Sequence, residues 1–268
     1  MDTVDIHATL SPKERAWKTR FAMLWGHLAI RVIVLAIALT ALFLAARWQP
    51  VFWLLIPAGI LGQMLSEYLI HRFIFHLPPP RNQFWFNLLY LCHYGHHDFP
   101  TKPALFFVPI WFALPMLLAG LLLYGVLFRL AGFADAFDMA LAIGVIGHGI
   151  AFLGYEWYHM TAHINIRKFA PERRVTRLHN LHHFKDYGRN FHVSFGGEVI
   201  DRTLGTAISE RDRQALERRN FIRTIGLDPG DARLVRARAD FAGRIGLSEA
   251  EQVQARRGSK LGAGPDQA

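Results

Sequence analysis

The chain has 268 residues, of which 52% are hydrophobic, and it carries a formal net charge of +9 at neutral pH. Its length suits a single domain. Its one cysteine, Cys92, excludes an intrachain disulfide. The excess positive charge lies mostly in the C-terminal part, which has no nucleic-acid recognition motif, so nucleic acid is not expected as a partner.

Four apolar runs are long enough to cross a bilayer as helices, which takes about 20 residues. They are Leu28–Ala46, Val51–Ile70, Ala104–Phe128 and Ala136–Tyr158. None has the alternation of a barrel strand, so each is predicted to be a transmembrane helix. The first run starts late and a second follows at once, so it is not expected to be a cleaved signal peptide. The sequence predicts an all-α, multi-pass integral membrane protein.

Lysine and arginine predict how the spans are oriented. Four of them precede the first span, three lie in the 71–103 connection, and 20 of the 30 follow Tyr158. By the positive-inside rule, these three regions and both termini are expected on the cytoplasmic face. The predicted divisions are a cytoplasmic amphipathic N-terminal segment (1–27), a four-span domain with a cytoplasmic helical cap (28–206), a cytoplasmic basic helical tail (207–257) and a disordered C-terminus (258–268).

Ten of the fourteen histidines form four clusters with repeated spacing. Neutral imidazole is the commonest nitrogen ligand for transition metals. Ten imidazoles are too many for one ion but suit two ions held close together, and structural zinc would favour cysteine-rich tetrahedra instead. The predicted ligands, all just past the second and fourth spans, are His71, His76, His93, His96, His97, His159, His163, His179, His182 and His183.

The spacing within the clusters predicts how they face. Positions i, i+3 and i+4 share one face of a helix, so the members of each His-x2-His-His triplet are expected to point the same way. His159 and His163 are four residues apart and also share a face. His71 and His76 are five apart, so either the helix distorts there or the pair straddles two ions.

Further polar residues lie beside the clusters. Carboxylates commonly accept the second ring N–H of a ligating histidine and fix its tautomer. Candidates for that role, or for additional ligands, are His192, Glu67, Asp98, Glu156 and Asp186. His148 lies in the middle of the fourth span and is a candidate substrate-channel residue. No separate catalytic acid or base is assigned beyond the dimetal centre.

At these residues the chain resembles the fatty acid hydroxylase superfamily, which includes sterol desaturases, fatty-acid 2-hydroxylases and carotenoid hydroxylases. The resemblance covers about residues 50–206. The four histidine motifs occur in the family's order. Tyr155-Glu-Trp-Tyr-His159 is similar to the aromatic run before the family's third motif, and Asp201-Arg-Thr-Leu-Gly-Thr206 is similar to its closing motif. The spacing is most similar to the fatty-acid 2-hydroxylase type.

The resemblance implies an oxygenase with two iron ions that activates O2 and hydroxylates a C–H bond of a lipid taken from the bilayer. The lipid would be fatty acyl, sphingolipid or sterol-like. Zinc can replace iron in nitrogen sites, so zinc in a purified sample would also be compatible with such a centre. Because only about 27 residues precede the first span, electrons are expected from a separate electron-transfer protein rather than from a fused haem domain.

Three alternatives remain open from the sequence. Desaturation, or cleavage of a C–C or ether bond, needs the same centre and differs only in how the substrate is placed. A metal transporter would have its ligands near the middle of the membrane, where only His148 lies. A zinc-dependent lipid hydrolase would need three or four ligands and leave most of the histidines unexplained.

Overall fold

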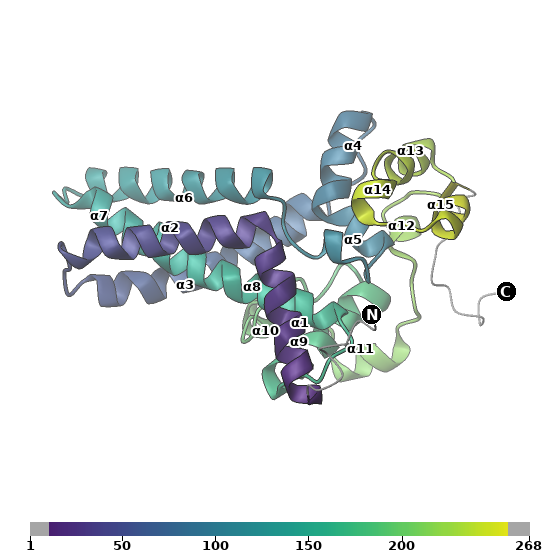
Figure 1. Cartoon of the computed structure of the whole chain (residues 1–268), viewed down its shortest axis with the longest axis horizontal. Coiled ribbons are helices and arrows are strands. Elements are labelled where there is room, and N and C mark those ends of the chain that lie inside the picture. Colours follow the sequence, from purple (N-terminus) through teal and green to yellow (C-terminus); the bar gives the residue numbers. More distant parts are fainter. Residues whose placement is uncertain (1–10, 257–268) are drawn as a thin grey trace, which may run out of the picture.

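The computed structural model describes residues 11–256, and within that range all regular structure is helical. Four helical segments are long and apolar enough to span a membrane: Leu28–Ala45, Phe52–Phe75, Pro103–Leu130 and Ala136–His163. They lie alongside one another as the rod in Figure 1. The all-α, four-span prediction is confirmed, and the second and fourth spans run further toward the histidine clusters than the apolar runs alone suggested.

The spans are built mainly from five α-helices and two π-helical segments. The short 3-10 turn at Pro103–Leu105, which begins the third span, packs against the cap. The helices are α2 (Leu28–Ala45), α3 (Phe52–Ile70), α6 (Ile110–Leu130), α7 (Ala136–Ala140) and α8 (His148–His163). The π segments are η1 (His71–Phe75), which continues α3, and η4 (Leu141–Gly147), which joins α7 to α8. A π-helical turn pairs residues five apart and shifts every following side chain around the helix.

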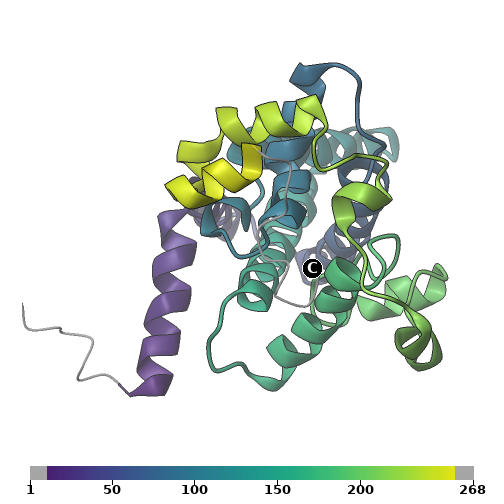
Figure 2. The ribbon, with the colours of Figure 1, turned by 90° about the vertical axis from the view of Figure 1, so that its right-hand side faces the viewer.

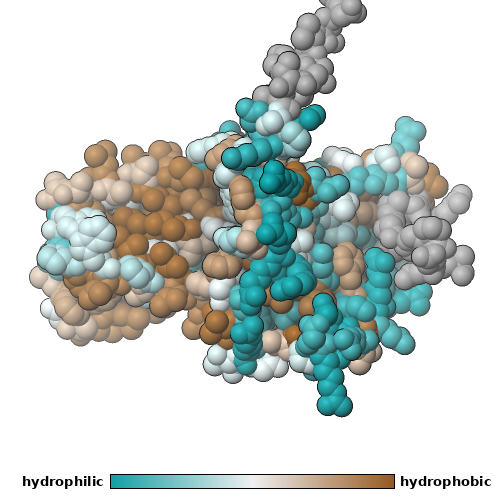
Figure 3. Space-filling view, turned by 90° about the horizontal axis from the view of Figure 1, so that it is seen from below, coloured by the Kyte–Doolittle hydropathy of each residue, from teal (hydrophilic) through white to brown (hydrophobic). Residues whose placement is uncertain are grey.

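Close backbone contact joins the second and fourth spans. A Cβ on Gly59 of α3 would overlap the carbonyl oxygen of Ile143 in η4 and lie 3.0 Å from the Cα of Gly147. Small residues allow such contact between membrane helices. Close packing matters there because apolar side chains gain no hydrophobic stabilisation by leaving lipid. Leucines cover the outside of the rod instead; Leu54 and Leu122 are exposed. Figure 3 shows that the surface of the rod is hydrophobic, whereas the surface of the rest of the molecule is largely hydrophilic.

The other half of the molecule is a cap of shorter helices gathered at one end of the rod (Figures 1 and 2). Its segments are α1 (Pro12–Gly26), α4 (Gln83–Leu89), η2 (Tyr90–Tyr94), α5 (Gly95–Asp98), η3 (Pro103–Leu105), α9 (Ala170–Phe184), α10 (Glu198–Thr203), α11 (Glu210–Ala215), α12 (Phe221–Thr224), α13 (Ala232–Asp240), α14 (Ala242–Ile245) and α15 (Glu249–Arg256). The predicted disordered C-terminus, 258–268, lies outside the described residues.

A buried ion pair fixes the first helix of the cap to the helix that carries the last histidine triplet. Arg20 of α1 donates to Glu172 of α9 over 2.5 and 2.9 Å, and both side chains are almost fully buried. Trp157 of α8 also donates its indole N–H to Glu172 over 3.0 Å. Because a buried charge is tolerated only when it is paired and hydrogen-bonded, this contact ties α1 to the first turn of α9.

Candidate metal centre

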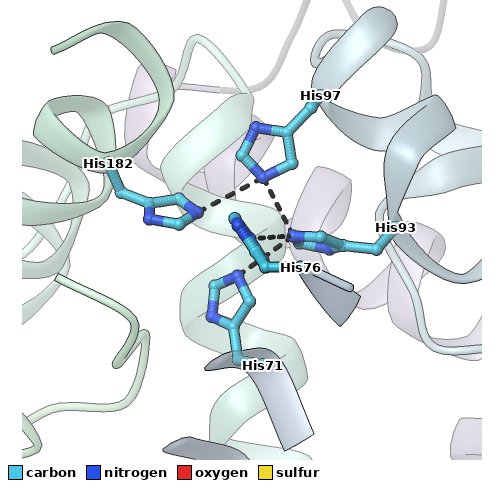
Figure 4. A group of neighbouring side chains, drawn as sticks. All are labelled: His71, His76, His93, His97 and His182. Atoms are coloured by element: carbon cyan, nitrogen blue, oxygen red, sulfur yellow. Dashed lines mark hydrogen bonds between the residues drawn. The ribbon is translucent and has the colours of Figure 1, made fainter. Parts of the chain in front are cut away.

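The structure gathers the ten predicted histidines into two groups of five. Within each group the candidate ligand nitrogens lie within 4.8 Å of one another. The first group is His71, His76, His93, His97 and His182, which converge from four segments in Figure 4. The second group is His96, His159, His163, His179 and His183.

The spacing between nitrogens fits coordination of an ion. In the first group, His93 Nε2 lies 3.0 Å from that of His71 and 2.9 Å from those of His76 and His97. Nearest Nε2 pairs in the second group are 2.8 to 3.1 Å apart. Two nitrogens bound at about 2.1 Å and at right angles on one ion would be about 3.0 Å apart. Each group can therefore hold one ion through its Nε2 atoms.

Of the two alternatives that the sequence left open for His71 and His76, the structure shows a distorted helix. The π-helical turn η1 begins at His71 and brings residues five apart onto one face, so both imidazoles enter the first group. A second π-helical turn, η2, carries His93. Both turns lie beside the site, as π-helical turns often do in functional regions.

The prediction that each triplet points one way is wrong. His93 and His97 belong to the first group, whereas His96 belongs to the second; likewise His182 lies in the first group, apart from His179 and His183. Neighbouring residues on a helix diverge by about 100°, so each triplet is divided between the two histidine groups rather than facing one. This split keeps the groups side by side, and His97 stacks on His183 with ring centroids 4.1 Å apart.

Main-chain carbonyls orient three of the rings. His159 Nδ1 pairs with the carbonyl of Phe106 over 2.7 Å, and His182 Nδ1 with that of Arg189 over 2.8 Å. His71 Nδ1 pairs with the carbonyl of Phe191. An N–H donated from Nδ1 fixes the tautomer that leaves the Nε2 lone pair free for a metal.

The segment from Asp201 to Thr206 supports this arrangement. The carboxylate of Asp201 accepts from the backbone N–H groups of Phe191 and His192 over 2.9 and 3.0 Å, and from the Thr206 hydroxyl over 2.8 Å. Asp201 thereby holds the loop whose carbonyl receives His71.

Burial keeps the imidazoles neutral. Burial first, and neighbouring imidazoles second, hold the pKa of His76, His93 and His97 well below the usual range. Burial lowers the pKa of His182 to about 4. A neutral imidazole has a free lone pair, so near pH 7 these side chains are in the form that binds a metal.

The four carboxylates expected beside the clusters have other partners. Glu67 accepts from the backbone of Val193 and Ser194 over 2.6 and 3.1 Å, and Glu156 from the backbone N–H of Val108 over 2.9 Å. Asp98 pairs with an arginine described below, and Asp186 accepts from the backbone N–H of Gly188. Carbonyls of packed loops take the place expected for carboxylates, since they can accept a ring N–H without burying a charge.

Two further predicted residues lie outside both groups. His192 pairs through Nε2 with the carbonyl of Met64 over 3.0 Å, and its Nδ1 is 3.2 Å from Glu67. A side chain on Gly197 would collide with its ring, so this glycine makes room for it. His148 lines a cavity of about 280 Å³ that also reaches His71.

The C-terminal helices add two residues that sequence reasoning missed. Phe221 of α12 stacks on His97 with centroids 3.9 Å apart. Arg238 of α13 donates to both oxygens of Asp98, over 2.7 Å each, and Tyr90 donates to the same carboxylate over 3.2 Å. Phe221 also packs in a core with Phe86 of α4. No sequence pattern marks these residues, because the contacts join segments more than 120 residues apart.

Fold and site together define a class: a four-span, all-helical membrane protein with two adjacent all-histidine groups in a cap at one end of the spans. Residues 56–206, more than half of the chain, match the fatty acid hydroxylase family. The chain belongs to the fatty acid hydroxylase family, as its histidine motifs predicted.

Similar proteins include a dihydroceramide fatty acyl 2-hydroxylase from Arabidopsis thaliana, 27% identical over 59% of this chain and 62% of the relative. A fatty acid 2-hydroxylase from Rattus norvegicus is 30% identical over 54% of this chain and 38% of the relative. The chain thus spans less than two thirds of either relative. The solved hydroxylase domain of scs7p shares the fold, with a TM-score of 0.54 and 24% identity over 67% of this chain and 64% of that one.

The ion pair between Arg238 and Asp98 yields a first prediction. Replacing Arg238 by Met leaves a buried carboxylate unpaired next to His97, which typically costs about 3–5 kcal/mol. We expect a clear fall in the thermal unfolding temperature of the purified protein, and a smaller fall for Arg238→Lys. Arg236→Met is the matched control, since Arg236 lies on the same helix with a side chain 68% exposed. Equal melting temperatures for the Arg238 and Arg236 variants would contradict the role given to this pair.

Cys92 yields a second prediction. Burial raises the pKa of its thiol to about 12, and only the thiolate is strongly nucleophilic. We expect iodoacetamide at about pH 8 to leave the folded protein unlabelled over an hour and to label it fully once sodium dodecyl sulfate unfolds it. Mass spectrometry of the intact chain measures this, with Cys92→Ala as the blank. Rapid labelling of the folded protein would show that this thiol is accessible and reactive.

Proposed function

We propose that this protein is an O2-dependent hydroxylase of a membrane lipid that works with two iron ions, one in each histidine group. The observation that carries the proposal is the pair of adjacent five-imidazole groups in a segment matching the fatty acid hydroxylase family. The proposed ligands are His71, His76, His93, His97 and His182 for one ion, and His96, His159, His163, His179 and His183 for the other.

The number and type of the nitrogen ligands favour a redox-active metal over hydrolytic zinc. Imidazole suits iron and zinc alike, but a zinc hydrolase needs only three or four ligands and an open position, and ten converging imidazoles exceed that need. Bound iron would supply the strong oxidant that an unactivated C–H bond requires. In the overall reaction one oxygen atom enters the C–H bond and the other leaves as water, with two electrons and two protons supplied from outside.

The position of the groups supports a lipid substrate. They lie at the cap ends of the second and fourth spans, whereas a transport pathway would place them near the middle of the membrane. The cavity that reaches His71 is bounded by apolar side chains such as Ile70, Phe112 and Phe152. An acyl chain bound there would place a C–H bond beside the first group and keep water away from it. Relatives named for fatty acids and dihydroceramide support a fatty acyl or sphingolipid substrate.

We propose that the cap faces the cytoplasm. The supporting observation is that most basic residues outside the spans lie on the side of the cap, whereas only Arg47 and Arg129 lie at the opposite ends of the spans. A cytoplasmic cap would let a separate soluble or membrane-anchored electron-transfer protein reach the metal centre. The domain divisions follow the same proposal: a four-span domain with its histidine cap over 28–206, preceded by the segment 1–27 and followed by a basic helical tail over 207–257.

This proposal predicts a change in membrane lipids. Cells that express the chain under ¹⁸O2 are expected to contain a lipid class heavier by one labelled oxygen atom. The class should be absent from cells that express His182→Ala, because His182 Nε2 belongs to the first group. Lipid mass spectrometry measures this, with Arg236→Met as a control that leaves the metal groups intact.

The alternatives give different masses. Loss of two hydrogens without labelled oxygen would identify a desaturase on the same site. Unchanged lipids in cells that also supply a ferredoxin or cytochrome donor, with iron present in the purified protein, would contradict the proposal. Incorporation of the label by the His182→Ala variant at the full rate would contradict the role given to that histidine.

A further inference from the structure

The cavity beside His71 ends deep in the membrane at a cluster of polar side chains. It lies between α3, α6 and α8. At the cap end its walls include His71 and Glu67; at the other end they include Gln63, Tyr124 and His148. Tyr124 and His148 form a hydrogen bond of 3.0 Å between the Tyr124 hydroxyl and His148 Nε2. The ends of the cavity are therefore polar, and the walls between them are mostly apolar, with Ser66 as a polar exception.

The length of the cavity follows from α3. A Cβ on Gly62 would lie 2.9 Å from the Tyr124 hydroxyl and 3.0 Å from His148 Nε2, so this pair is level with Gly62. His71 is nine residues further along the same continuous helix, which corresponds to about 13 Å at the rise of an α-helix. The polar pair thus lies about one long alkyl segment away from the first histidine group.

Polar side chains at this depth are costly unless they have hydrogen-bond partners. The bond between Tyr124 and His148 uses one donor and one acceptor. A tyrosine hydroxyl both donates and accepts, so the pair can form a further hydrogen bond whichever atom carries the shared proton. The amide of Gln63 adds two donors and one acceptor to the same end of the cavity. A lipid whose inner end is an unsubstituted alkyl group would leave these hydrogen-bond donors and acceptors without a partner.

We propose that this cavity binds a lipid with an apolar body and a hydroxyl or carbonyl oxygen at its inner end, where the Tyr124–His148 pair and Gln63 hydrogen-bond that oxygen. The carbon to be oxidised then lies about 13 Å away, beside His71. The inference rests on the proposed function and narrows its substrate class to lipids with an oxygen function remote from the oxidised carbon. The pair acts as a specificity determinant.

The wall formed by α6 supports access from the bilayer. Met116 and Leu123 both line the cavity, and 41% and 56% of their surfaces are exposed. The cavity wall therefore reaches the lipid-facing surface of the rod. A lipid could pass between helices from the bilayer with its inner oxygen already at membrane depth.

A binding assay tests this independently of catalysis. The purified full chain in lipid nanodiscs is incubated with tritium-labelled dodecanol, and unlabelled dodecanol or dodecane is used as the competitor. Empty nanodiscs give the background. Since one neutral hydrogen bond changes affinity by roughly tenfold, dodecanol should displace the label at about one tenth of the concentration that dodecane needs. Because no turnover is required, the result holds even if no lipid proves to be hydroxylated.

Two variants separate recognition from a purely structural link between α6 and α8. Tyr124→Phe removes the hydroxyl, and Gly62→Ala places a methyl group against the pair while leaving both polar groups in place. Both should lose the tenfold preference while still binding dodecane, whereas Leu122→Ala on the lipid-facing side of α6 should keep it. Equal displacement by the two ligands in the wild-type protein, or a preference that survives in both cavity variants, would overturn the proposal.

Discussion

The structure depends on holding ten imidazoles, eight of them buried and two half-buried, in neutral form with their Nε2 atoms facing one another. Few buried polar groups can face each other so closely without a shared partner, and a metal ion in each group would supply it. The arrangement is supported from outside the groups. Carbonyls of Phe106, Arg189 and Phe191 hold three rings by their other nitrogen. These supports use uncharged acceptors, so they would leave the positive charge of the bound ions uncompensated and favour the binding of anionic oxygen species.

The sequence predicted most of the fold, and it identified the ten histidines that the structure gathers into two groups. The length of the apolar runs was enough to locate the spans, because a membrane-spanning helix can be identified from its own sequence without knowledge of its tertiary contacts. The repeated spacing identified the ten histidines, because that spacing reflects the need to bring imidazoles together and does not depend on how the helices pack. The sequence left open whether the helix distorts at His71 or the pair straddles two ions. The spacing shows that His71 and His76 are five residues apart, but it does not show how the backbone accommodates them.

Contacts between distant segments could not be predicted. The division of each triplet between two groups depends on how α5 and α9 are rotated, and packing against other helices sets that rotation. Phe221 and Arg238 reach the site from the basic tail, where arginines are so frequent that none stands out. The carboxylates were expected beside the rings by analogy with other metal sites, whereas here the loops supply carbonyls and the carboxylates hold backbone or arginine.

Membrane and cap have complementary roles in this arrangement. The spans enclose a largely apolar cavity that reaches the first histidine group. The cap ends of the spans and the cap together supply the nitrogen donors, and Phe221 of the cap closes the site. In the proposed reaction, a site at this boundary would let an insoluble lipid be oxidised without leaving the bilayer, while electrons and protons would arrive from the aqueous side. The buried pairs Arg20–Glu172 and Arg238–Asp98 tie the cap segments to the helices that carry the ligands.

The central claim is that each histidine group binds its own ion, and metal analysis after anaerobic loading with Fe²⁺ tests it most directly. The account predicts two irons per chain for the wild-type protein. It predicts one for a variant with His93 and His97 replaced by Ala, and one for a variant with His179 and His183 replaced by Ala, provided that both keep the wild-type helical content. A single iron in the wild-type protein, or loss of both irons in either variant, would show one shared site and contradict the account.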